Sequence, residues 1–117
     1  MKHTVALKQN HEFRRLYNRG KNAVSPYFAI YCRKNYREMS RLGITTGVKL
    51  GNAVKRNRVR RRIRELYRTN EHRIQCGYDI VVVARTRAIY ARYADLEQSF
   101  RKMLKKLELT VPVEERK

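Results

Sequence analysis

The chain has 117 residues, which is room for one compact domain with one hydrophobic core and too little for a second domain of ordinary size. Its 29 lysines and arginines against 10 acidic residues leave a formal net charge of +19, so a polyanion, first of all nucleic acid, is the expected partner. The sequence has no apolar window of about 18 residues and no signal-peptide core, which argues against a membrane partner and favours a cytoplasmic protein.

The first half of the chain predicts a short helix and two strands. Residues 1–9 are polar and are expected to form a flexible tail. Asn10 is placed to cap a helix that ends at Gly20, because apolar residues follow i, i+3, i+4 spacing at Phe13, Leu16 and Tyr17. Residues 27–33 and 42–48 alternate as half-buried strands. The expected inward positions are Phe28, Ile30 and Cys32 in the first strand, and Leu42, Ile44 and Val48 in the second.

The second half predicts two long helices around a buried strand. Asn52 is a suitable N-cap for a helix that runs to about residue 69. The continuous apolar run 80–84 is typical of a central strand buried on both faces. The last helix is amphipathic, and residues 110–117 are expected to form a second flexible tail. Its apolar positions are Leu96, Phe100, Met103, Leu104 and Leu107, with Arg101, Lys102, Lys105 and Lys106 facing outward. The fold class is therefore α+β, with helices against a small sheet.

The helix over residues 55–68 carries the strongest functional signal. Drawn at 100° per residue, its packing stripe is Val59, Ile63, Leu66 and Tyr67, and the opposite face is Asn57, Arg61, Arg64 and Arg68. Arg58 and Arg62 lie on one flank, and Arg60 lies on the other. A run of like charges is often only a solvated helix face, but here Glu65 is the one acidic residue among eight cations. Guanidinium groups match phosphate oxygens, so the density favours a nucleic-acid contact.

The remaining candidate residues indicate binding rather than catalysis. Tyr27, Tyr31 and Arg33 share a strand face that would either stack unpaired bases or simply cover the core. The histidines are isolated, and no phosphate-binding loop, nucleophile elbow or zinc motif is present, so neither catalytic nor metal-binding residues are predicted. Cys32 and Cys76 are expected to be reduced, structural thiols.

The stretch from Lys49 to Arg64 resembles the signature of the bacterial ribonuclease P protein subunit. The family pattern has a Lys, a Gly-x-Ala-Val, an Arg-Asn pair, two basic residues and a further Arg. It is met at Lys49, Gly51, Ala53, Val54, Arg56, Asn57, Arg60, Arg61 and Arg64. The order of the other elements resembles the family along nearly the whole chain, although Thr86 stands where many members have Lys.

The resemblance implies a single domain over residues 1–117, a two-layer sandwich of order αβββαβα. Its basic helix would form an unusual left-handed crossover, as in the ribosomal protein S5 domain 2-like fold. It also implies a subunit of a ribonucleoprotein endonuclease that removes the 5′ leader of precursor tRNA. The RNA subunit and the substrate would hold the Mg2+ ions and the RNA would hold the catalytic centre, with ribonuclease P RNA and precursor tRNA as partners and no obligate protein partner.

Two sets of site residues follow from the helix face and the resemblance together. The RNA-binding set is Lys49, Arg56, Asn57, Arg58, Arg60, Arg61, Arg64 and Arg68. The resemblance implies a leader-binding cleft lined by Phe13, Tyr17 and Tyr31. Two alternatives stay open: a non-catalytic binding module such as a small ribosomal protein, and a nuclease that acts without RNA.

Overall fold

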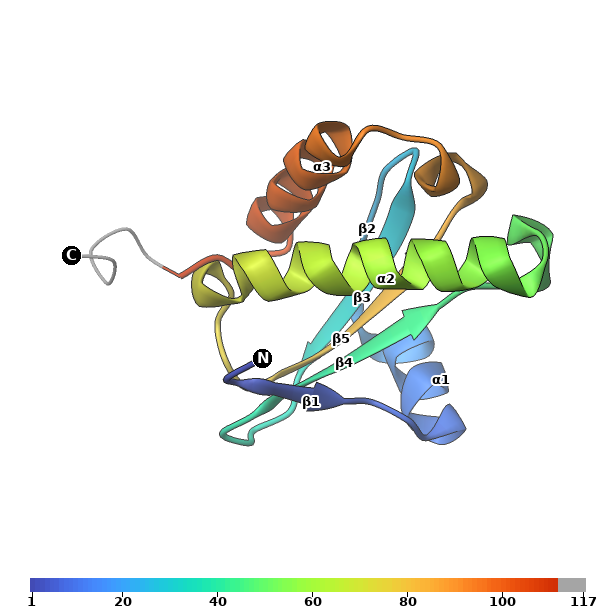
Figure 1. Ribbon diagram of the computed structural model, residues 1–117. Coiled ribbons are helices and arrows are strands. Elements are labelled where there is room, and N and C mark those ends of the chain that lie inside the picture. Colours follow the sequence, from blue (N-terminus) through green and yellow to red (C-terminus); the bar gives the residue numbers. More distant parts are fainter. Residues whose placement is uncertain (112–117) are drawn as a thin grey trace.

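The computed structural model describes residues 1–111, and within them the chain forms one five-stranded sheet and three α-helices (Figure 1). The helices are α1 (Asn10–Arg19), α2 (Ala53–Asn70) and α3 (Tyr93–Lys106). The strands are β1 (Thr4–Ala6), β2 (Lys21–Val24), β3 (Phe28–Lys34), β4 (Ser40–Thr45) and β5 (Tyr78–Ala84). Short 3-10 helices are η1 (Val48–Leu50), η2 (Glu71–Arg73) and η3 (Thr86–Ile89).

The order of strands across the sheet is β1-β4-β5-β3-β2, which puts β5 at the centre. β4 runs parallel to both β1 and β5, whereas β3 is antiparallel to β5 and β2. The apolar run predicted as a central strand is confirmed, since Ile80, Val81 and Val82 are all fully buried. The α+β class and the order αβββαβα are confirmed, with β1 preceding α1.

The parallel strands β4 and β5 are connected through α2, as expected. In Figure 1 both strands run toward the end of the sheet where α2 begins, α2 returns in front of them, and β5 lies above β4. This path is a left-handed crossover, the opposite of the hand that parallel strands usually adopt. Its consequence is that α2 shares one face of the sheet with α3, while α1 lies on the other.

Each face of the sheet has its own apolar cluster. The larger cluster joins the sheet to α2 and α3, with Phe28 and Ile30 facing Tyr67 and Phe100. The predicted stripe of α2 is confirmed, because Val59, Ile63, Leu66 and Tyr67 are at most 1% exposed. The smaller cluster, beneath α1, is built on Leu7, Leu16 and Val81. The sheet with α2 and α3 gives the two expected layers, and α1 adds a partial third.

The N-terminal residues are ordered differently from the expectation of a flexible tail. Thr4–Ala6 form β1, and the two carboxylate oxygens of Glu71 accept hydrogen bonds from the backbone N–H groups of Lys2 (2.9 Å) and His3 (3.2 Å). Thr4 is buried, with its hydroxyl 3.0 Å from that of Tyr67. The prediction failed because a three-residue strand pairing with a strand some 36 residues away leaves no local pattern. In the predicted C-terminal tail, Thr110 forms a β-bridge with Ile74, and the Val111 N–H donates to the carbonyl oxygen of Arg73 in η2. Residues 112–117 lie outside the described residues.

Other details of the sequence-based picture are also corrected. β2 was not predicted from the pattern, because Ala23 is its one buried residue. β4 ends at Thr45, so Val48 lies in η1 with 79% of its surface exposed rather than in the core. Gln9, not Asn10, occupies the cap position of α1. Gly20 has an ordinary negative φ, and a side chain is excluded there because a Cβ would lie 2.7 Å from the Leu16 carbonyl oxygen.

Candidate nucleic-acid interface

The basic helix α2 begins at a defined cap. The Asn52 side-chain oxygen accepts a hydrogen bond from the Lys55 N–H at 3.0 Å, as its position in the sequence predicted. The preceding Gly51 has φ +120°, a conformation that side chains rarely tolerate. The turn at Gly51 sends the chain from η1 into α2, and Lys49 therefore lies exposed just before the first turn of the helix.

Most of the predicted RNA-binding side chains project from α2 into solvent. Lys49, Asn57, Arg58, Arg61 and Arg64 are exposed, and Arg56 is half-buried. Among residues 1–111, none of these six side chains takes part in a hydrogen bond or an ion pair. Their donors are therefore available to an external anion, as a nucleic-acid contact requires.

Two arginines of α2 differ from the rest. Arg68 makes a two-point ion pair with Glu65, at 2.5 and 3.0 Å, which lowers the pKa of the glutamate and offsets part of the positive charge. Arg62, on the flank, donates to the carbonyl oxygens of Ala88, Ile89 and Ala91 at 2.9, 3.1 and 2.5 Å. Burial, and then the neighbouring charge of Arg58, lower the pKa of Arg62. We conclude that Arg62 fastens η3 to α2 and has little freedom to bind a ligand.

Arg60 lies on the opposite flank and extends past the end of β4. Its guanidinium donates to the Thr46 hydroxyl at 2.5 Å, and Thr46 is itself buried. There Arg60 joins residues of α1 around one concavity, which we call the α1 hollow. Its lining residues are Asn10, Phe13, Arg14, Tyr17, Ile44, Thr45, Thr46 and Arg60. A second concavity beside β1 shares Phe13 and Arg60 and adds Arg64.

The aromatic residues predicted to line a cleft do lie together at this place. The Phe13 ring covers Gly43, where a Cβ would come within 2.5 Å of the ring. Tyr17 and Tyr31 meet edge to face with ring centroids 5.0 Å apart, and the Tyr17 hydroxyl is 3.2 Å from that of Thr45. Tyr31, Val81 and Gly43 are paired across the sheet on the side that faces α1. Because Gly43 has no side chain, the Phe13 ring packs directly against β4 there.

Some expected surface residues lie elsewhere. Tyr27 is not on the face of Tyr31, because it precedes β3 and packs against the α3 side of the core. Sequence reasoning missed Arg14, which lines the α1 hollow, although its spacing of three residues from Tyr17 places both on one face of α1. Cys32 is a buried thiol whose pKa burial raises to about 11, as expected for a structural cysteine, but Cys76 is exposed.

Within residues 1–111, no group of three or more His, Cys, Asp or Glu side chains is arranged to hold a metal ion. In the same part of the chain, each helix is too short or too polar to cross a bilayer.

Comparison with known proteins identifies the family. The model of the family described as Ribonuclease P matches residues 1–108. The ribonuclease P protein component of Clostridioides difficile is 39% identical over 109 residues, covering 92% of this chain and 96% of that protein. That of Natranaerobius thermophilus is 37% identical, covering 93% and 95%.

Solved structures agree with this assignment. The ribonuclease P protein of Staphylococcus aureus has a TM-score of 0.80 and 33% identity, and the alignment covers 91% of this chain and 97% of that one. The ribonuclease P protein of Thermotoga maritima gives 0.78 and 31%, covering 86% and 96%. The chain therefore belongs to the family of bacterial ribonuclease P proteins, the protein subunits of the ribonucleoprotein endoribonuclease that processes the 5′ end of tRNA.

Proposed function

We propose that this chain binds ribonuclease P RNA through the exposed cations of α2 and holds the 5′ leader of precursor tRNA in the α1 hollow. The observation that carries the proposal is the position of Arg60. It belongs to the basic helix, yet its guanidinium lies at Thr46 beside Phe13, so that one side chain connects the two surfaces. A single-stranded RNA leader that starts next to α2 would therefore meet a positive charge all the way into the α1 hollow.

The exposed residues of α2 supply the contacts with the RNA backbone. Arg56, Arg58, Arg61 and Arg64 offer guanidinium groups on a rigid helix, and Lys49 adds a charge before its first turn. Asn57 adds an amide that both donates and accepts, which suits a ribose hydroxyl or a base edge. Arg68 is expected to contribute less, since Glu65 already binds its guanidinium.

The α1 hollow suits an unpaired strand. Phe13 and Tyr17 present aromatic surface beside Arg14 and Arg60, and Tyr31 supports Tyr17 from the sheet. Single-strand binders combine such aromatic surfaces with flanking cations, and stacking contributes about 1–3 kcal/mol per base. The leader is the single-stranded part of the substrate, so it is the expected occupant.

The chemistry of cleavage is assigned to the RNA subunit. Mg2+ would be bound mainly by that RNA and by the substrate, and the role of this chain is to position both. We further propose that the subunit acts in the cytoplasm, where precursor tRNA is made, and needs no other protein partner.

Reconstitution tests this function directly. The purified chain is mixed with ribonuclease P RNA and a precursor tRNA at low Mg2+ concentration, and cleavage at the mature 5′ end is measured. We expect stimulation over RNA alone and no cleavage by the protein alone. Absence of stimulation would refute the proposal, and cleavage without RNA would show an independent nuclease.

The leader assignment has its own test. Tyr31→Ala should weaken binding of substrates with a long leader by about tenfold, equivalent to about 1.4 kcal/mol, and leave leaderless tRNA unaffected. Tyr36→Ala is the matched control, since Tyr36 is 87% exposed in the loop between β3 and β4, apart from the hollow. Equal losses for both substrates would assign Tyr31 to packing alone.

A further inference from the structure

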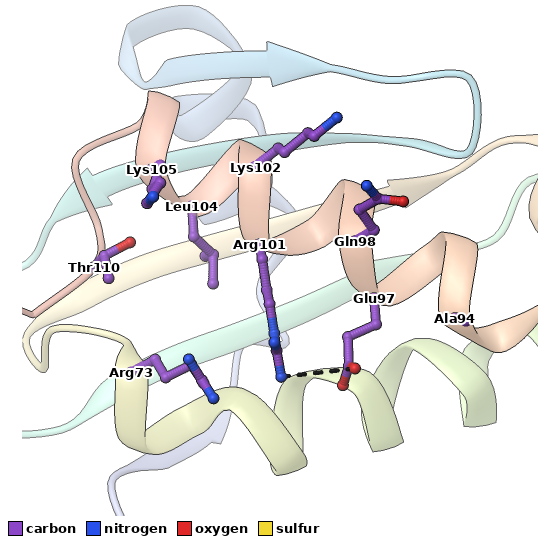
Figure 2. A pocket seen from close by; sticks show the side chains of 9 residues that line it. All are labelled: Arg73, Ala94, Glu97, Gln98, Arg101, Lys102, Leu104, Lys105 and Thr110. Atoms are coloured by element: carbon purple, nitrogen blue, oxygen red, sulfur yellow. Dashed lines mark ion pairs between the residues drawn. The ribbon is translucent and has the colours of Figure 1, made fainter.

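A second cationic surface lies between α3 and the C-terminal end of α2. It is a groove of about 430 Å3. Four cations line it, and Figure 2 shows them: Arg73 of η2 and Arg101, Lys102 and Lys105 of α3. We call it the α3 groove. Among the described residues, Glu97 is the one carboxylate that lines it. Four cations and one carboxylate leave three positive charges, and the α2 contacts proposed above do not use any of them.

The two arginines of the groove are positioned by the fold. Arg101 Nε donates to the Asn70 side-chain oxygen at 3.1 Å, and Asn70 is fully buried, with its amide nitrogen donating to the Leu66 carbonyl oxygen at 2.8 Å. Figure 2 shows Arg101 pointing from α3 toward α2, next to Arg73. Arg101 also pairs with Glu97, the two groups lying 3.6 Å apart, so its guanidinium is fixed in the groove and part of its charge is already offset.

Arg73 is the second arginine that lines the groove. Its Nε is buried and has no acceptor among residues 1–111, although buried donors are nearly always paired. Its backbone is fixed at the same time, because the Arg73 carbonyl oxygen accepts from the Val111 N–H at 2.9 Å. The buried Nε is itself out of an anion's reach, so Arg73 would contact a phosphate only through the outer end of its guanidinium, whose donors match phosphate oxygens.

The position of the groove identifies its occupant. α3 lies on the face of the sheet opposite α1, and the α3 groove shares no lining residue with the α1 hollow, so we expect a leader held in the hollow not to contact the groove. We propose that the α3 groove binds the phosphodiester backbone of ribonuclease P RNA, at a segment separate from the one that contacts the exposed face of α2. This inference rests on the proposed function and extends it, because the protein would then hold two segments of the RNA at once.

Two adjacent lysines of α3 provide the test. Lys105 lines the α3 groove, whereas Lys106 lines a different concavity beside Tyr27, and both are exposed. Lys105→Glu and Lys106→Glu therefore change the net charge equally. Binding of each full-length variant to ribonuclease P RNA is measured over a range of salt concentrations. We expect Lys105→Glu to bind at least threefold more weakly than Lys106→Glu. The slope of log K against log[salt] should be smaller in magnitude for Lys105→Glu than for Lys106→Glu, by about one. Glu97→Gln should strengthen binding.

The outcomes separate this inference from the function on which it rests. Equal effects of the two lysine variants on RNA binding would show that the groove contributes only general positive charge, and would overturn the inference. Stimulated cleavage by the unaltered chain would in that case still support the proposed function. A second measurement uses the assembled holoenzyme at saturating protein concentration. There Lys105→Glu should bind precursor tRNA normally, and a selective loss would assign the groove to the substrate instead. Thermal unfolding of both variants checks that the fold is unchanged.

Discussion

Arg61 and Arg62 are neighbours with the same charge, and the structure predicts opposite consequences of losing them. Arg62 binds three carbonyl oxygens of residues 88–91, whereas Arg61 is exposed and binds none among residues 1–111. A hydrogen bond to a charged group contributes about 1.5–3 kcal/mol when buried. Because Arg62 is only partly buried, we expect Arg62→Gln to lower the free energy of unfolding by about 2–4 kcal/mol in total.

The assay compares Arg61→Gln with Arg62→Gln. For a domain of this size, the predicted loss lowers Tm by roughly 10 °C in Arg62→Gln and by little in Arg61→Gln. Below Tm, binding to ribonuclease P RNA should show the reverse, with the salt slope reduced by about one in Arg61→Gln and nearly unchanged in Arg62→Gln. If both variants unfold at the same temperature, or if Arg62→Gln reduces the slope as much, the division of α2 into anchoring and RNA-binding arginines is wrong.

Two further predictions concern the α1 side of the sheet and the N-terminus. Gly43→Ala should push the Phe13 ring away from β4 and lower the free energy of unfolding by about 1–3 kcal/mol. We expect it to weaken leader binding without changing the affinity for ribonuclease P RNA. Gly47→Ala is the control, because an added Cβ meets open space there. Although burial raises the pKa of Glu71, hydrogen bonds from Thr4 and from the N–H groups of Lys2 and His3 lower it overall. The stabilisation of β1 is then fully present above about pH 4.5 and is lost as pH falls through the lower folded value. The protection of residues 4–6 against hydrogen exchange, measured relative to the intrinsic rate at each pH, should therefore fall in acid. Glu71→Gln should lower that protection at neutral pH and remove its dependence on acid, and unchanged protection would contradict the proposed anchoring.

The sequence predicted the parts of the fold that repeat locally. Stripes at helical spacing identified the packed faces of α2 and α3, and a continuous apolar run identified β5. The motif around Asn57 then indicated the family. These successes share one cause, because burial of one face imposes a period that can be counted along the chain.

What the sequence did not reveal depends on partners far away in the chain. The helical angle puts Arg62 on a flank of α2, but it does not show that carbonyl groups of η3 face that flank. Nor does it show that Glu71 binds the N–H groups of residues 2 and 3. Within the candidate site, the aromatic residues named from the resemblance lie together on the α1 side of the sheet, and their role in leader binding stays a prediction. The contact of Arg60 with Thr46 could be found only from the fold.

The hand of the crossover links the fold to the proposed site. β4 and β5 are parallel neighbours, so the hand of their connection decides which face of the sheet α2 covers. A right-handed connection would put α2 on the face where Phe13 lies over Gly43, and the helix would fill the α1 hollow. The left-handed path puts α2 on the opposite face, close enough to the end of β4 for Arg60 to reach Thr46. The unusual topology therefore leaves the aromatic surface open while keeping a cation of the basic helix at its rim, and the leader site proposed above depends on both features.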